Sequence, residues 1–252
     1  MLAWAKSLIR STPLERPAKI VWRLFGPRQT EPVSSHIKNQ WYDQLTEKII
    51  ARVLRPDSNA IDVGAHAGEI LRVIVTQAPF GTHWAVEPLP SFAAQLRDQF
   101  EGVNVLELAL SDRTGDSTFQ YVTNDPAYSG LRRHPYDRDD PQIEEIRVKV
   151  DTLDNILERA EKIDFMKVDV EGGELPLFRG ASKMILSNRP YIVFEHGKRA
   201  AAAYGAGSED IFDFLSQHGL GVSRLDDWLD GKPALTRRQF SDGRDFMFLA
   251  HP

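Results

Sequence analysis

The 252-residue chain contains no cysteine and has no long hydrophobic run. The first absence excludes a disulfide framework, catalysis by a thiol and a metal site built from thiolates. The second argues against a transmembrane helix, which needs roughly 20 consecutive apolar residues. The chain does have 42% hydrophobic and 27% charged residues, which is typical of a globular domain with a substantial core. These features are compatible with a cytoplasmic protein, and we expect that location.

Acidic residues are scarce at the N-terminus. Residues 1–28 carry six Lys or Arg against Glu15 alone, a net charge of +5, although the whole chain carries −5. Apolar residues at helical spacing accompany these cations. Such a segment can lie on the anionic inner face of a membrane, or it can pack on the domain or on a second copy of the chain in a homodimer. We favour packing. The sequence therefore predicts a basic N-terminal arm at residues 1–35 and one domain at 36–252.

The rest of the chain alternates between short apolar runs and segments with helical spacing. We expect an α/β fold with a mainly parallel sheet and helices on both faces. Ligands in such sheets bind beyond the carboxyl ends of the strands. The expected strands are 60–63, 83–86, 103–110, 116–122, 146–150, 163–170, 191–195, 219–225 and 245–250. The expected helices are 36–54, 67–78, 91–100 with Ser91 as N-cap, 152–160, 175–186 and 208–218.

A glycine turn follows the first expected strand. Asp62 ends that strand, Gly64 and Gly68 follow it, and Glu87 ends the next strand. This layout is typical of a βαβ ligand site in which the acid holds a ribose. A dinucleotide fingerprint has a second glycine that admits a pyrophosphate, but His66 occupies that place here. S-adenosylmethionine has no phosphate, so the pattern favours it as the cofactor.

A second motif spans residues 163–174, where acidic residues follow a strand that is apolar enough to be buried. Asp169 follows the strand, and Glu171 and a glycine pair come next. Buried carboxylates are costly unless they meet a cation or hydrogen-bond donors. A sulfonium ligand and a substrate hydroxyl would supply such partners. Glu174, by contrast, is explained by the preference of acids for a helix N-terminus.

Together these motifs closely resemble the FkbM-type methyltransferases. The resemblance covers roughly residues 55–200, with the motifs in family order: Asp62–Glu69, Val86-Glu87-Pro88, Ala109–Asp112, Val150–Asp154, Lys167–Glu174 and Glu195. It implies the seven-stranded class I methyltransferase sheet, S-adenosylmethionine as cofactor, and methylation of hydroxyls on sugars, glycolipids, glycans or polyketide-type products. His66 departs from the family, which usually has Asn there, so the contacts to the methionine moiety are open.

The resemblance also assigns residues to the cofactor. Asp62 and Gly64 would flank the methionine moiety, and Gly68 would allow close helix packing. Glu87 would accept hydrogen bonds from both ribose hydroxyls. Asp112 would meet the adenine amino group, although a turn-forming Ser-Asp pair explains it equally well. The predicted cofactor set is Asp62, Gly64, His66, Gly68, Glu87, Pro88, Ser111 and Asp112.

A hydroxyl is a weak nucleophile, so a general base or a metal would help the transfer. Asp169 is the first candidate base, His196 is the second, and Glu171 completes the predicted catalytic set. Alternatively, Asp169, Glu171 and Glu195 could hold a divalent metal through oxygen ligands. The spacing of these residues does not separate the two options.

A polar segment at residues 123–141 interrupts the alternation and is either a substrate loop or a plain surface loop. Tyr128, Ser129 and Arg132 in it, together with Glu195, are the predicted contacts to a small-molecule or glycan acceptor. The body of the chain has no basic stripe, so we do not expect a nucleic-acid partner. Two other functions stay open: a non-catalytic module that binds the same cofactor, and a nicotinamide-dependent enzyme.

Overall fold

A computed structural model describes residues 35–136, 140–157 and 162–252. The chain divides into two compact units, 1–39 and 40–252. Almost all of the predicted basic arm lies outside the described residues. The first described helix is α3 (Ser35–Val53). All the other elements described below belong to the second unit. None of the described helices is long and apolar enough to cross a bilayer.

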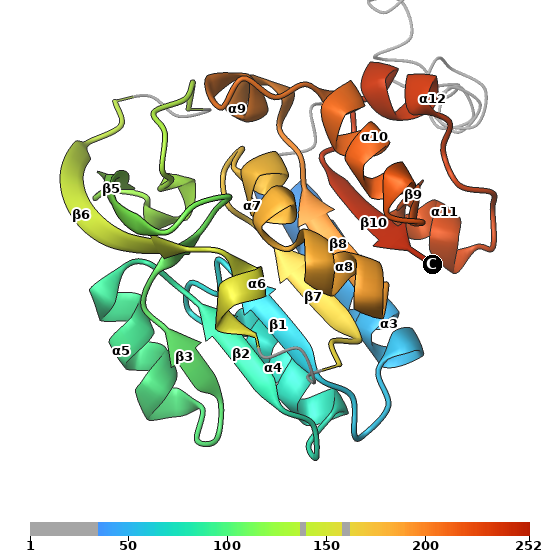
Figure 1. Ribbon diagram of the computed structural model, residues 1–252, viewed down its shortest axis with the longest axis horizontal. Coiled ribbons are helices and arrows are strands. Elements are labelled where there is room, and N and C mark those ends of the chain that lie inside the picture. The colour runs from blue at the N-terminus through green and yellow to red at the C-terminus, as the bar shows by residue number, and fades with distance from the viewer. Residues whose placement is uncertain (1–34, 137–139, 158–161) are drawn as a thin grey trace, which may run out of the picture. The chain divides into compact units, whose positions relative to one another are not determined.

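Seven strands form the main sheet of the second unit (Figure 1). All of them run parallel except β10, which is antiparallel to both of its neighbours. This arrangement confirms the expected class I methyltransferase sheet. In spatial order the strands are β3 (Asn104–Leu106), β2 (His83–Val86), β1 (Ala60–Val63), β7 (Phe165–Val168), β8 (Tyr191–Glu195), β10 (Met247–His251) and β9 (Gly221–Arg224).

Helices cover both faces of this sheet because its strands are apolar on both sides. Met166 of β7 packs in a cluster that includes Phe178 and Leu215 from helices on one face. The preceding residue of β7, Phe165, packs with Ile49 and Ile74 from helices on the other face. The helices after α3 are α4 (Glu69–Gln77), α5 (Pro90–Gln99), α6 (Leu153–Ile156), α7 (Glu174–Gly180), α8 (Ser182–Asn188), α9 (Lys198–Ala203), α10 (Ser208–Gln217), α11 (Leu225–Leu229) and α12 (Arg237–Asp242), with a 3-10 turn η1 (Pro126–Tyr128).

A second, three-stranded sheet lies beyond the carboxyl ends of β1 and β2 (Figure 1). It consists of β4 (Ala109–Leu110), β6 (Ile143–Asp151) and β5 (Gly115–Val122) in that order. We call this sheet, together with residues 123–136, the roof. The prediction of one strand at 103–110 was wrong, because the chain leaves the main sheet after β3 and pairs with β6 from Ala109 on.

Three predicted helices also differ from the structure. Helix α5 begins at Pro90, and Leu89 occupies the N-cap position, so Ser91 is not the cap. The segment expected as one helix at 175–186 forms α7 and α8, which meet at Ala181. Helix α6 ends at Ile156, although its start is as expected, with the Thr152 hydroxyl accepting a hydrogen bond from the Asn155 amide. Residues 158–161 of the expected helix lie outside the described residues.

Candidate functional site

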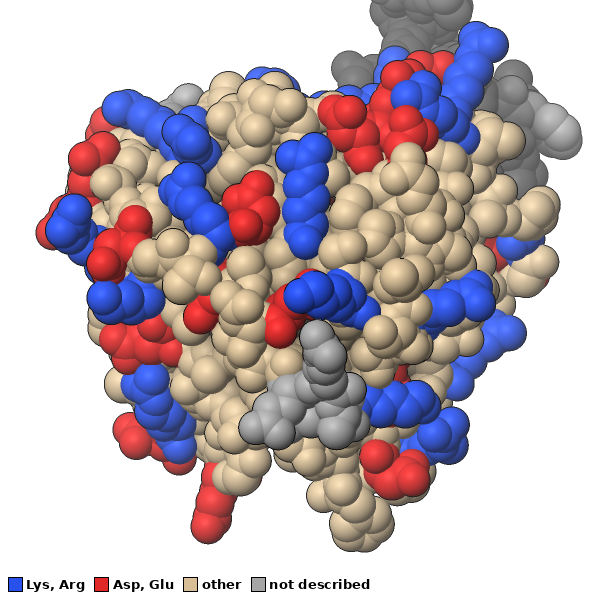
Figure 2. All heavy atoms as spheres, viewed as in Figure 1, with Lys and Arg blue, Asp and Glu red and all other residues tan. Residues whose placement is uncertain are grey.

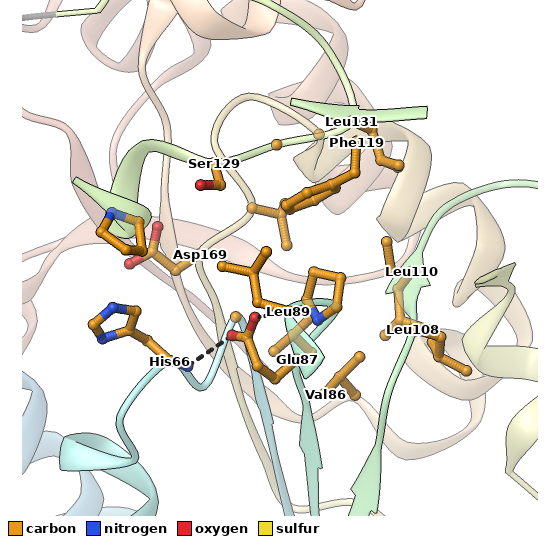
Figure 3. Close-up of a pocket in the computed structure, with 18 of the residues that line it drawn as sticks. His66, Val86, Glu87, Leu89, Leu108, Leu110, Phe119, Ser129, Leu131 and Asp169 are labelled. Carbon is orange, nitrogen blue, oxygen red and sulfur yellow. Dashed lines mark hydrogen bonds between the residues drawn. The ribbon is translucent and has the colours of Figure 1, made fainter. Parts of the chain in front are cut away.

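A cavity lies at the carboxyl edge of the main sheet, between the strand ends and the roof (Figure 3). The space inside it is about 730 Å³ when the open mouth is included. We call the loops after β1, β2 and β7 (residues 64–68, 87–89 and 169–173) the floor. The floor contributes Gly64, His66, Glu87, Pro88, Leu89, Asp169 and Gly173 to the lining, and the roof contributes Leu110, Phe119, Ser129, Gly130 and Leu131 among others.

Gly64 fixes the floor where β1 ends. Its φ of +73° is in the left-handed region that favours glycine. A Cβ at this position would lie 1.9 Å from the carbonyl oxygen of Asp169. The Gly64 amide also donates a hydrogen bond to the carbonyl of Val86. The loops after β1, β2 and β7 therefore meet at this glycine, with no room for a side chain.

Glu87 is held by the backbone on both carboxylate oxygens. Its Oε2 accepts a hydrogen bond from the His66 amide and its Oε1 accepts one from the Leu89 amide, each at 2.9 Å (Figure 3). Burial raises the pKa of Glu87 to about 7. A carboxylate has about four lone-pair sites, so each oxygen keeps capacity for one more donor. The two hydroxyls of a ribose fit that remaining capacity.

The two ends of the cavity differ in polarity (Figure 3). Leu89, Leu108, Leu110, Phe119 and Leu131 make an apolar end that suits an adenine ring. At the other end lie His66 and Asp169. The His66 ring packs on Phe92, with 4.0 Å between centroids, and occupies the place where a dinucleotide site needs glycine. These residues fit S-adenosylmethionine better than a pyrophosphate.

Four residues of the predicted cofactor set do not line the cavity: Asp62, Gly68, Ser111 and Asp112. Asp62 is buried, which raises its pKa to about 6, although the charge of Lys167 acts in the opposite direction. Gly68 packs against Phe100, because a Cβ there would lie 2.6 Å from the ring. Asp112 is exposed. The structure therefore shows no contact of these four residues with the cavity.

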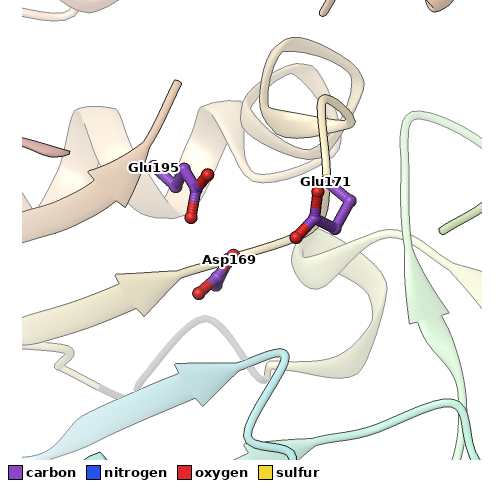
Figure 4. Close-up of side chains that lie close together, drawn as sticks. All are labelled: Asp169, Glu171 and Glu195. Atoms are coloured by element: carbon purple, nitrogen blue, oxygen red, sulfur yellow. The ribbon is translucent and has the colours of Figure 1, made fainter. Parts of the chain in front are cut away.

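Three carboxylates come together where β7 and β8 end: Asp169 and Glu171 of the floor, and Glu195 (Figure 4). One oxygen of each lies within 4.8 Å of the others. Burial and the neighbouring carboxylates hold the pKa of Glu171 and Glu195 well above the usual range. Lys167 is the nearby cation, and its Nζ donates to Asp169 Oδ2 at 2.9 Å. The three oxygens fit a divalent cation as hard ligands, but Lys167 already contacts the carboxylate of Asp169.

Glu171 links this acidic cluster to the roof. Its φ of +50° is unusual for a residue with a side chain and places it in the tight turn after β7. The Nε2 of His134 in the roof lies 3.6 Å from Glu171 Oε2. Asp169 is the member of the cluster that lines the cavity, whereas Glu171 and Glu195 lie beside it.

The structure places His196 away from the cavity. Its Nε2 is 2.8 Å from the Ser208 hydroxyl, and its ring stacks on Phe240. Burial lowers the pKa of His196 to about 4. Of the predicted acceptor contacts, Ser129 lines the cavity, whereas Tyr128 and Arg132 do not. The Ser129 hydroxyl accepts a hydrogen bond from the Val122 amide and so holds the roof together.

Sequence reasoning missed Tyr204, Gly173 and the apolar lining of the cavity. Tyr204 follows α9, a helix that the sequence analysis did not predict. The alternating apolar positions of β5 contained the signal for Phe119. No pattern marked Tyr204, because its role depends on a contact between segments about 70 residues apart in sequence.

Comparisons with known proteins agree with this geometry. A family model described as the methyltransferase FkbM domain matches residues 62–220. The AMB antimetabolite synthetase AmbE of Pseudomonas aeruginosa (strain PAO1) is 30% identical over 218 residues, covering 71% of this chain and 10% of that protein. The chain thus spans about a tenth of the length of this curated relative.

Two solved structures are similar in fold. The methyltransferase FkbM from Methylobacillus flagellatus KT has a TM-score of 0.48 and is 16% identical, covering 79% of this chain and 44% of that one. The plantazolicin methyltransferase BpumL in complex with SAH has a TM-score of 0.41 and is 11% identical, covering 97% and 96%. Because the family model matches more than half of its length, the chain belongs to the FkbM methyltransferase family, whose cofactor is S-adenosylmethionine.

Proposed function

We propose that this domain transfers a methyl group from S-adenosylmethionine to a hydroxyl of a sugar, a glycolipid or glycan, or a polyketide-type product. The observation that carries the proposal is the position of Asp169, whose carboxylate borders the same cavity as Glu87. The bound cofactor supplies an electrophilic methyl group together with its leaving group. The protein therefore has to align an acceptor and take up its proton.

The floor and the apolar end of the cavity hold the cofactor in this proposal. Glu87 accepts hydrogen bonds from the ribose, and the leucines and Phe119 pack on the adenine. Gly64 and His66 lie on the methionine side. Asp62 and Gly68 support the floor without lining the cavity. This assignment predicts that the protein binds S-adenosylmethionine, but not NAD, in a calorimetric titration.

Asp169 is the proposed general base. Lys167 Nζ donates to its Oδ2 and orients the carboxylate, which accepts the proton of the acceptor hydroxyl. Glu171 and Glu195 lie close enough to receive that proton afterwards. His196 has no part in this route, because it is buried away from the cavity between Ser208 and Phe240.

The transfer is tested with methyl-labelled S-adenosylmethionine and a panel of sugars, glycolipids and polyketide alcohols. We expect a methyl ether on one class of acceptor, identified by mass spectrometry. Asp169→Asn should lose nearly all activity and still bind the cofactor. Asp116→Asn is the control, because Asp116 is exposed on β5 away from the cavity. Methylation of an amine, or full activity of Asp169→Asn, would contradict the proposal.

A divalent metal is the alternative aid to the hydroxyl, and the close approach of Asp169, Glu171 and Glu195 favours it. Activity is measured in chelator and after magnesium or manganese is added back. Full activity in chelator would exclude an essential metal and leave Asp169 as the base. Loss of activity that is restored by one ion would instead assign the cluster as the metal site.

We also propose a small-molecule or glycan acceptor rather than a nucleic acid. On the face in Figure 2, cationic and anionic side chains are interspersed, and the net charge is −5. A cytoplasmic location and a role of residues 1–28 in membrane contact or a homodimer also stay proposals. Vesicle co-sedimentation and the oligomeric state, each compared with a chain lacking residues 1–28, test that role. Salt-insensitive, equal partitioning of the two forms would exclude membrane contact.

A further inference from the structure

Tyr204 stands where the roof meets the floor. Its hydroxyl oxygen accepts a hydrogen bond from the Arg132 amide at 3.1 Å. A Cβ on Gly130 would lie 3.4 Å from the same oxygen, and a Cβ on Gly173 would lie 3.4 Å from the Tyr204 ring. The ring is therefore packed between the roof and the turn after β7, with a glycine on each side. Gly130, Gly173 and Tyr204 all line the cavity.

The helix that precedes Tyr204 is itself seated tightly on the floor. Gly172 has a φ of +95°, and a Cβ there would lie 2.4 Å from the backbone carbon of Ala200 in α9. Helix α9 thus rests on the turn after β7 without an intervening side chain. This contact fixes the position of Tyr204 relative to Asp169. Burial raises the pKa of the Tyr204 hydroxyl, so the group stays a neutral phenol at physiological pH.

Other contacts between described residues also join the roof to the floor, since Leu89 of the floor packs in one cluster with Phe119 and Val150 of the roof. Among the described residues, the His134–Glu171 contact at 3.6 Å is one of them, and it is longer than a hydrogen bond. Most hydrogen bonds of the roof are internal, such as those between Gln120 and Gly130. Leu131, next to the bonded Arg132 amide, lies at the apolar end of the cavity (Figure 3).

We propose that Tyr204 is a positioning residue that holds the roof closed over the bound cofactor through its hydrogen bond to Arg132. The inference rests on the proposed cofactor site. Without the hydroxyl, residues 130–132 open more often, and Leu131 leaves the adenine. The cofactor then dissociates faster, while its association is little changed.

The test compares the wild-type protein with Tyr204→Phe, which keeps the ring and removes the hydroxyl. Hydrogen exchange of the Arg132 amide in the ligand-free protein should speed up by about three- to tenfold, as expected for one lost hydrogen bond. The dissociation rate of S-adenosylmethionine, measured by stopped flow, should rise by a similar factor. Tyr121→Phe is the matched control, because Tyr121 lies in the same roof and its hydroxyl bonds no described residue.

A thermal unfolding scan checks that both variants are folded. Unchanged exchange at residues 130–132 in Tyr204→Phe would overturn the inference, and so would an equal effect of Tyr121→Phe. Faster exchange with an unchanged dissociation rate would overturn it as well. If the wild-type protein itself fails to bind S-adenosylmethionine, the proposed function fails instead, and the exchange experiment on ligand-free protein still reports on the contact between Tyr204 and Arg132.

Discussion

The floor and the roof of the cavity are built in different ways. In the floor, backbone groups fix the geometry: Gly64 leaves no space beside the carbonyl of Asp169, and two amides donate hydrogen bonds to the two carboxylate oxygens of Glu87. The roof, by contrast, is a small separate sheet that meets the rest of the site through side chains: Leu89 of the floor packs in one cluster with Phe119, and the Tyr204 hydroxyl accepts a hydrogen bond from the Arg132 amide. A floor of this kind tolerates almost no substitution, whereas a roof of this kind can vary in sequence and move as a unit.

This difference separates two tasks of the site. In the proposed function, the floor holds the cofactor, which is the same in every reaction, and it gains from rigidity. In the same proposal, the roof covers the cavity where an acceptor enters. Substitutions that disturb the backbone packing of the floor should therefore abolish binding, whereas substitutions in the roof should change rates and affinities by modest factors.

The largest effect is expected from Gly64→Ala. The new Cβ would overlap the carbonyl oxygen of Asp169, so β1 or β7 has to shift, and the positive φ adds strain. We expect a loss of unfolding free energy of about 3 kcal/mol or more, as for other severe steric changes in a core. S-adenosylmethionine binding should be undetectable by calorimetry.

Gly231→Ala is the control for this prediction. Gly231 has a φ of +74°, close to the +73° of Gly64, but a Cβ there would have no neighbour within 4 Å. It should cost only about 1–2 kcal/mol from backbone strain and leave cofactor binding intact. If the two variants behave alike, the tight packing of the floor is not what matters, and the comparison with the roof fails.

The sequence predicted the floor well because the floor depends on local patterns. The bounds of β1, β2 and β8 agree with the predicted strands, since each is a short apolar run that is buried on both faces. Glycines and acids at the ends of such strands are visible without a structure. The roles of the residues there stay predictions, but the structure does bring Gly64, His66, Glu87 and Asp169 to one cavity.

The roof was less predictable because it depends on contacts between distant segments. An apolar run at 103–110 does not reveal that Leu106 pairs in one sheet and Ala109 in another. Ser111 and Asp112 follow β4 and were predicted to bind the cofactor, with Asp112 at the adenine, but the residues that line the cavity are the apolar ones before them. Tyr204 acts through the Arg132 backbone amide, which no side-chain pattern encodes.

A second prediction concerns the pH dependence of the floor. The pKa of Glu87 is raised by burial from 4.5 to about 7 in the ligand-free protein. The ionised form accepts hydrogen bonds from the ribose, so cofactor affinity should increase as pH rises through 7, by up to about tenfold between pH 6 and 8. Glu87→Gln should bind more weakly and lose this part of the slope. Glu107→Gln, an exposed residue that pairs with Arg97, is the control.

The stability of the ligand-free protein should change in the opposite direction. A carboxyl group whose pKa is higher in the folded state contributes stability below its unfolded pKa of 4.5, and this is lost as pH rises through the folded value. Asp62, with a pKa of about 6, and Glu174, with about 8, act in the same direction. Thermal scans from pH 5.5 to 8.5 should therefore show falling stability where binding strengthens. If thermal stability and cofactor affinity both rose with pH, the assignment of Glu87 would be refuted.

The smallest effect is expected in the roof, from Leu131→Ala. Leu131 is partly buried at the apolar end of the cavity, so truncation removes contacts with the adenine but leaves the backbone bond to Tyr204 in place. A few buried methyl groups are worth about 1 kcal/mol, which corresponds to a rise in the dissociation constant of about three- to tenfold. Leu186→Ala on α8 is the control, because Leu186 is 61% exposed and lies outside the cavity lining. A complete loss of cofactor binding in Leu131→Ala would show that the roof is as sensitive to substitution as the floor, and the division of tasks between them would then be wrong.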